Sequence, residues 1–151
     1  MMKTLRDEKC REKLIGRVQR LTSDARPAWG KMNVEQMLSH LVQANELPFV
    51  ASVPDRSNWM SRTVIKPLVL YVMPIPKEVK TSPAMDQQLD GRKPRGFDAD
   101  KTQLVESIKK LGTLSEEHRC LAHPFFGELS ARQWGMLAHK HMDHHLRQFG
   151  A

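Results

Sequence analysis

The stretch from Ser130 to Gly150 constrains the fold most strongly, because its residues predict one capped amphipathic helix. Ser130 and Gln133 have the spacing of a capping box, and Gly150 is a stop signal. Four of the seven histidines of the chain lie in this stretch. At about 100° per residue, one face of the helix combines apolar residues with two histidines. This face contains Trp134, Leu137, Ala138, His141, His145 and Gln148.

The two histidines on this face, His141 and His145, are four residues apart. Side chains with this spacing are neighbours on a helix, so both imidazoles can reach a single metal ion, as in the zinc-protease helix. The alternative is that they are histidines at the edge of the core that donate hydrogen bonds to carbonyl groups. The spacing alone leaves both interpretations open.

The two other histidines of the predicted helix have different positions. His144 lies at the edge of the apolar face. His139 projects nearly opposite to His141, beside Lys140 and Asp143, on the face that we expect to be exposed to solvent. We therefore exclude His139 as a metal ligand.

Two further amphipathic helices are predicted in the first third of the chain. Apolar residues recur at helical spacing over Thr4–Leu21. A second capping box, Asn33 with Gln36, starts the next helix, and Pro48 marks its end. His40 lies on the flank of this second helix. That position permits metal ligation without demanding it, and a partly buried, hydrogen-bonded histidine is the alternative.

The middle of the chain predicts a helical excursion over Ser61–Met73, then a long loop over 74–97 rich in proline and glycine. Asp98 or Asp100 is expected to cap a third long helix that ends at Gly112. The loop also carries five basic residues, which we interpret as solvated charges rather than contacts for an anionic substrate. They are Lys77, Lys80, Arg92, Lys93 and Arg95.

Composition narrows the class of protein. A length of 151 residues with 40% hydrophobic residues suits a single domain over 1–151. The net charge of +7 is scattered among acidic residues, which disfavours nucleic-acid binding. The N-terminal residues lack a signal-peptide core, the apolar run 64–76 is too short for a membrane span, and the two cysteines form no metal-binding motif. We therefore expect a cytoplasmic protein with free thiols and no membrane partner.

Four short motifs carry a family resemblance: WGKM at 29–32, MLSH at 37–40, HPFFG at 123–127 and HMDHHLRQFG at 141–150. Together with the predicted helices, they resemble the DinB/YfiT-like metalloenzyme superfamily, and more narrowly an uncharacterised branch of it known as a domain of unknown function. The resemblance covers almost the whole chain. It implies an all-α fold, a four-helix bundle with ligands that project inward, here with the helical excursion and long loop between helices two and three.

By position, the resemblance implies that His40, His141 and His145 are the three metal ligands. Relatives often carry Arg-Gly-Gln after the last ligand, whereas Leu-Arg-Gln follows here, and the additional His144 can compete with His145 through an i, i+3 pairing with His141. The side chains expected to support the ligands or contact substrate are His123, Trp134, His144 and Gln148.

Three neutral imidazoles leave a divalent ion its charge and an open coordination position. Zinc and nickel are the expected metals, with iron as a further option. Such an ion can activate water or a thiol, so a hydrolase and a thiol-dependent S-transferase acting on a small molecule are both possible reactions. The resemblance favours the S-transferase, with a low-molecular-weight thiol as partner. The alternatives are a non-catalytic metal-binding module and a basic nucleic-acid-binding protein. A homodimer is compatible with the sequence, and no acid or base residue can be assigned.

Overall fold

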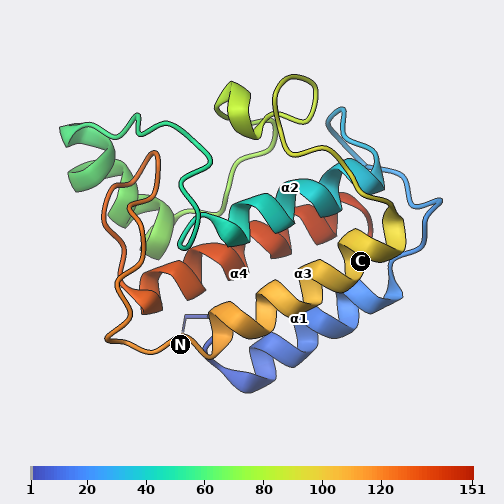
Figure 1. The fold of residues 1–151 in the computed structure, drawn as a ribbon, viewed down its shortest axis with the longest axis horizontal. Coiled ribbons are helices and arrows are strands. Elements are labelled where there is room, and N and C mark those ends of the chain that lie inside the picture. The colour runs from blue at the N-terminus through green and yellow to red at the C-terminus, as the bar shows by residue number, and fades with distance from the viewer. Residues whose placement is uncertain (1) are drawn as a thin grey trace.

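The computed structural model describes residues 2–151, and its architecture is all-α (Figure 1). The long helices are α1 (Glu8–Arg20), α2 (Val34–Glu46), α3 (Phe97–Gly112) and α4 (Ala131–Gln148). The short ones are η1 (Ser61–Ile65), η2 (Leu68–Val72) and η3 (Pro83–Met85). Within residues 2–151, every helix falls short of the length and apolar character that crossing a membrane requires.

The four long helices pack around a shared apolar core. α2 contacts α3 and α4, and α1 contacts the same two helices, while α3 and α4 also touch each other (Figure 1). Each helix contributes fully buried side chains, among them Leu14, Leu38, Leu104 and Leu146. The amphipathic patterns of the sequence are thus satisfied by helix-on-helix packing.

The helix starts show where capping chemistry was predicted correctly and where it was not. Both capping boxes form, at the starts of α2 and α4. The first helix begins at Glu8 rather than Thr4, because Asp7 is its N-cap and the buried Leu5 precedes it in a non-helical lead-in. The prediction that Asp98 or Asp100 caps the third helix is wrong. Gly96 occupies that position with φ of 116°, and both aspartates lie in the first turn.

The predicted helical excursion is confirmed over residues 59–72, which include η1 and η2. One face of this segment packs against the second apolar cluster of the molecule through Leu70. Other side chains of the segment are exposed, with Trp59 at 75% and Val72 at 72% of full exposure. The chain then continues into the long loop, which brings η3 against α2 (Figure 1).

Candidate metal centre

Three histidines from two helices converge between α2 and α4. His40 comes from α2, and His141 and His145 come from adjacent turns of α4. The Nε2 atom of His141 lies 3.1 Å from Nε2 of His40 and 3.1 Å from Nε2 of His145. The ligand atoms of all three residues lie within 4.8 Å of one another. We call His40, His141 and His145 the histidine triad.

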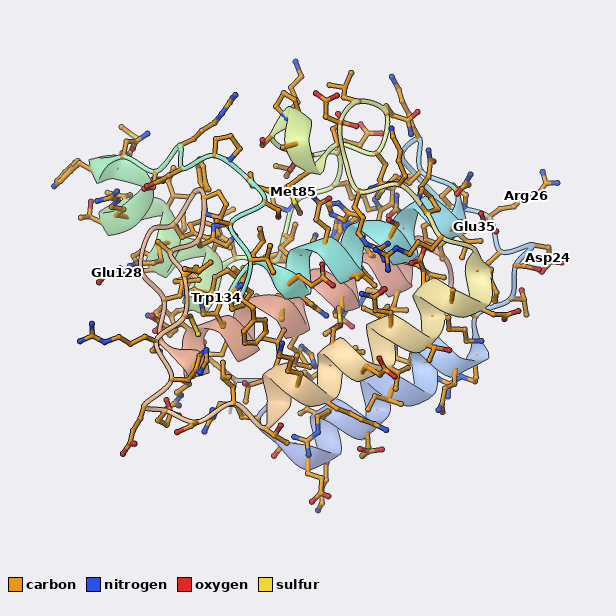
Figure 2. All side chains as sticks on the ribbon, in the orientation of Figure 1. Asp24, Arg26, Glu35, Met85, Glu128 and Trp134 are labelled. Carbon is orange, nitrogen blue, oxygen red and sulfur yellow. The ribbon has the colours of Figure 1, made fainter. Side chains whose placement is uncertain are left out.

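The long loop fixes the orientation of His40. Nδ1 of His40 lies 3.1 Å from the carbonyl oxygen of Met85, at the end of η3 where this loop lies over α2 (Figure 2). Because a carbonyl oxygen only accepts hydrogen bonds, Nδ1 must carry the proton and donate it. Nε2 of the neutral ring therefore presents a bare lone pair to the centre of the triad. Met85 was not identified from the sequence, because any residue type can supply a carbonyl group.

A second chain of hydrogen bonds fixes His145. Nδ1 of His145 lies 2.7 Å from Oε1 of Gln148, and Nε2 of Gln148 donates to the carbonyl oxygen of Trp29 at 2.7 Å. Since the amide nitrogen of Gln148 is used as a donor, its oxygen accepts from His145. Gly30 leaves room for this arrangement, because a Cβ atom there would lie 2.7 Å from Gln148 Nε2. His145 therefore also directs a bare Nε2 inward.

The triad cannot satisfy its own hydrogen-bonding groups. A neutral His141 has one ring proton, so its Nε2 can donate toward only one of the two bare nitrogens beside it. A tetrahedral ion with metal–nitrogen distances of about 2.0–2.1 Å separates its ligand nitrogens by about 3.3–3.4 Å. The observed spacings of 3.1 Å are close to this geometry. The three residues thus fit a divalent metal ion in donor type, orientation and separation, and the group could hold one.

Burial keeps the triad neutral. It lowers the pKa of His40, and it lowers the pKa of His145 to about 3, with His40 adding to the effect. The pKa of His141 is held well below its ordinary value by burial first and then by the charges of His145 and His40. Neutral imidazole is the form that binds metals, so all three rings are in the ligating state at pH 7.

Two of the residues predicted beside the ligands lie against the triad without joining it. The ring of His144 lies edge-on to two neighbours, with ring-centroid distances of 5.6 Å to Trp29 and 5.0 Å to His145. His144 does not belong to the group whose nitrogens converge. Gln148 orients His145, as described above. In the structure the ring that converges with His141 on this helix is that of His145, and which of the two binds a metal stays a prediction.

The prediction that His139 faces solvent is wrong. Its side chain is only 6% exposed, because the face of α4 that carries it packs against the N-terminal residues and α1. Gly135 permits this contact, since a Cβ there would lie 2.8 Å from Oγ1 of Thr4. Asp143 is also partly covered and pairs with Arg17 and Arg147. His139 is not in the group whose nitrogens converge, and its exclusion as a metal ligand stays a prediction.

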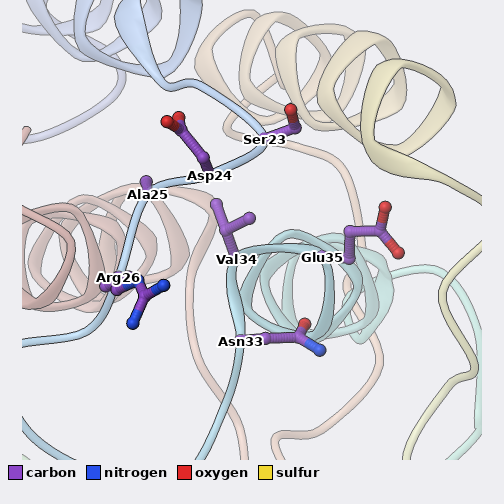
Figure 3. A pocket seen from close by; sticks show the side chains of 7 residues that line it. All are labelled: Ser23, Asp24, Ala25, Arg26, Asn33, Val34 and Glu35. Carbon is purple, nitrogen blue, oxygen red and sulfur yellow. The ribbon is translucent and has the colours of Figure 1, made fainter.

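A surface hollow of about 380 Å³ lies away from the triad, between the chain after α1 and the start of α2 (Figure 3). Two of the polar side chains that line it are already hydrogen-bonded within the chain. The side chain of Asn33 accepts a hydrogen bond from Gln36 as a helix cap, and a hydrogen bond from Thr22 lowers the pKa of Asp24. The lining contains no histidine or cysteine. The hollow therefore offers no histidine or cysteine ligands of the kind that the triad brings together.

Comparison with known proteins identifies a family without assigning an activity. Residues 3–151 match the family model described as "Protein of unknown function (DUF1569)". No curated protein and no solved structure gives a significant match. The geometry of the triad is therefore the main guide to function.

Proposed function

We propose that this protein, which belongs to the DUF1569 family of proteins of unknown function, binds one divalent metal ion through the histidine triad and uses it in catalysis. The observation that carries the proposal is the convergence of three Nε2 atoms, two of which have their lone pairs fixed inward by Met85 and Gln148. Hydrogen bonding at the outer ring nitrogen is typical of histidines that ligate metals.

The chemistry follows from the donor set. When bound by three neutral imidazoles, zinc or nickel keeps its double positive charge and an open position, where it lowers the pKa of water or a thiol and polarises a carbonyl group. Met85 orients the ring of His40, and Gln148, itself bound to Trp29, orients the ring of His145. We favour thiol-dependent S-transfer or hydrolysis on a small-molecule substrate. Membership of the DinB/YfiT-like superfamily, with its four-helix bundle, is part of this proposal and rests on the sequence motifs.

The test uses cobalt, whose visible spectrum reports its ligands. Cobalt-loaded wild-type protein is titrated with 2-mercaptoethanol, and the zinc-loaded protein is screened for thiol addition to electrophiles and for ester hydrolysis. We expect a new thiolate-to-cobalt absorption band, together with a metal-dependent reaction that is lost in His141→Ala. His118→Ala, at an exposed histidine remote from the triad, is the matched control. If neither a thiol nor an anion that competes with bound water changes the cobalt spectrum, the ion has no open coordination position and the catalytic proposal is contradicted.

The second candidate is a non-catalytic module in which the ion clamps two helices. It is supported by the origin of the ligands, because His40 belongs to α2 and the other two belong to α4. This candidate predicts that chelation lowers the melting temperature of the wild-type protein while thiols leave the cobalt spectrum unchanged. Both candidates require the triad, and the response of the spectrum to thiols separates them.

A further inference from the structure

Next to the triad lies a histidine whose free nitrogen must be a hydrogen-bond donor. Nδ1 of His123 accepts the backbone N–H groups of Phe125 at 3.0 Å and Phe126 at 3.2 Å. Since two N–H donors point at Nδ1, this nitrogen is bare and the neutral ring carries its proton on Nε2. The tight turn that makes this possible is closed by paired backbone hydrogen bonds between His123 and Gly127, which has φ of 71°.

Trp134, whose ring packs beside that of His123, carries a second donor without a partner. The ring centroids of His123 and Trp134 are 5.3 Å apart. Trp134 lies near the start of α4 (Figure 2). It is only 2% exposed. Its Nε1–H is the one fully buried side-chain nitrogen or oxygen in residues 2–151 that has no hydrogen-bond partner. Leaving a buried donor unpaired costs free energy, so an acceptor from outside the chain would stabilise this arrangement.

His123 and Trp134 lie over the same face of α4 as His141. Trp134 precedes His141 by seven residues, or two turns of α4, so the two side chains share one face of the helix. Because the ring of His123 packs against that of Trp134, His123 also lies over this face. His40 and His145 are 6% and 8% exposed, whereas His141 and His123 are both partly exposed. His123 and His141 are therefore the two rings of this group that solvent reaches.

We infer that the Nε2–H of His123 and the Nε1–H of Trp134 bind an oxygen of the substrate, in a planar carboxylate or carbonyl group, beside the histidine triad. Both groups donate and neither accepts, so the pair selects an acceptor and rejects a cation. The ring of Phe126, 4.8 Å from that of His123, adds an aromatic wall suited to a planar group. This inference rests on the proposed function for the placement of the reacting group, but the pair of donors does not itself require a metal.

The test observes the donor directly by nuclear magnetic resonance of the indole N–H groups, with acetate as the probe. Trp134→Phe assigns the resonance of Trp134, and the indoles of Trp29 and Trp59 serve as internal controls. We expect acetate to shift the Trp134 indole resonance in a saturable manner in both metal-free and zinc-loaded protein. A Trp134 resonance that stays still, or that drifts without saturation like that of the exposed Trp59, would overturn the inference.

His123→Asn isolates the contribution of His123. The asparagine oxygen can occupy the place of Nδ1 and accept the two backbone N–H groups, while the Nε2 donor is lost. We expect this variant to keep the turn and to bind acetate about tenfold more weakly, the effect of one hydrogen bond to a charged group. Unchanged acetate affinity would reject His123 as a donor. Because the metal-free sample is included, loss of metal binding would count against the proposed function and leave this test decisive.

Discussion

Two buried polar clusters are built on consecutive residues of α2, and they differ in whether they are complete. His40 belongs to the histidine triad, and Ser39, the residue before it, belongs to a cluster around Arg92 and Asp100. We call Ser39, Gln43, Arg92, Asp100 and Gln103 the arginine network. Both clusters fasten the long loop to α2, through Met85 in one case and Arg92 in the other.

The arginine network satisfies its own groups. Asp100 is fully buried and accepts from the Arg92 guanidinium at 2.9 Å and from the backbone N–H of Arg95 at 2.8 Å. The other guanidinium contacts go to Ser39 and Gln103, each at 2.8 Å. Arg92 is therefore not one of the solvated loop charges that the sequence suggested. A buried ion pair with all its partners in place needs no ligand.

The histidine triad is incomplete by the same criterion. Two fixed lone pairs face a third imidazole that can donate to only one of them, and burial prevents any of the rings from gaining a proton at pH 7. A cation would satisfy all three nitrogens at once. The comparison teaches that burial and polarity alone do not distinguish a candidate binding site, whereas converging lone pairs with too few donors do.

The largest expected effect is on the arginine network. Asp100→Asn leaves the buried Arg92 without its counter-charge, so we expect the free energy of unfolding to fall by about 3–5 kcal/mol in chemical denaturation. Asp98→Asn, at an exposed position in the same first turn of α3, is the control and should cost less than about 1 kcal/mol. Folded Asp100→Asn protein should still bind metal. Loss of metal binding there would show that the two clusters are not independent.

The next effect concerns stabilisation by metal. Zinc at about 100 times its dissociation constant should raise the free energy of unfolding of wild-type protein by about 2.7 kcal/mol, provided that it binds only the folded state. The same zinc concentration should not stabilise His141→Ala. Differential scanning calorimetry with and without zinc measures both. Equal stabilisation of the two proteins would place the ion elsewhere.

Gln148 tests the support of the triad rather than the triad itself. Gln148→Ala removes the acceptor for Nδ1 of His145, and we expect metal affinity to fall by about 10–100-fold, as measured by competition with a chelating dye. Arg147→Ala, one position earlier and exposed, is the control. An affinity equal to that of wild type would mean that helix α4 alone holds His145 in place.

Acid should weaken the metal-free triad. The pKa of His145 falls from 6.5 in the unfolded chain to about 3 in the folded protein, so the unfolded state binds the proton first as pH falls. The free energy of folding that depends on a neutral His145 is fully present above pH 6.5 and is lost as pH falls toward 3. His145 contributes about 1.4 kcal/mol of that loss at pH 5.5. In urea denaturation, the free energy of unfolding of His145→Gln should fall less steeply with decreasing pH than that of wild type. Equal dependence on pH in the two proteins would contradict the lowered pKa of His145.

The sequence predicted most of what is local. The capping boxes at Asn33 and Ser130 are short-range patterns, and both form as predicted. The spacing of His141 and His145 placed both on one helix face, as the structure has them. His40 was joined to them only through the family resemblance, because its own position permitted either interpretation. Their role as metal ligands stays a prediction.

Tertiary contacts account for what the sequence did not predict. His139 has polar neighbours in sequence and was expected to face solvent, but the chain before α1 covers it through the gap left by Gly135. Asp100 is of a residue type that commonly caps helices, but here it lies in the first turn of α3 and pairs with Arg92, eight residues earlier in the loop. The carbonyl groups of Met85 and Trp29 complete the candidate site without any side-chain signal.

The most direct test of the central claim is the metal content of protein purified without a histidine tag, measured by inductively coupled plasma mass spectrometry. We predict close to one equivalent of a divalent transition metal in wild-type protein and in His118→Ala, and loss of that metal in both His40→Ala and His141→Ala. Metal that remains in the folded His40→Ala and His141→Ala variants, or wild-type protein that takes up no metal even after supplementation, would contradict the account.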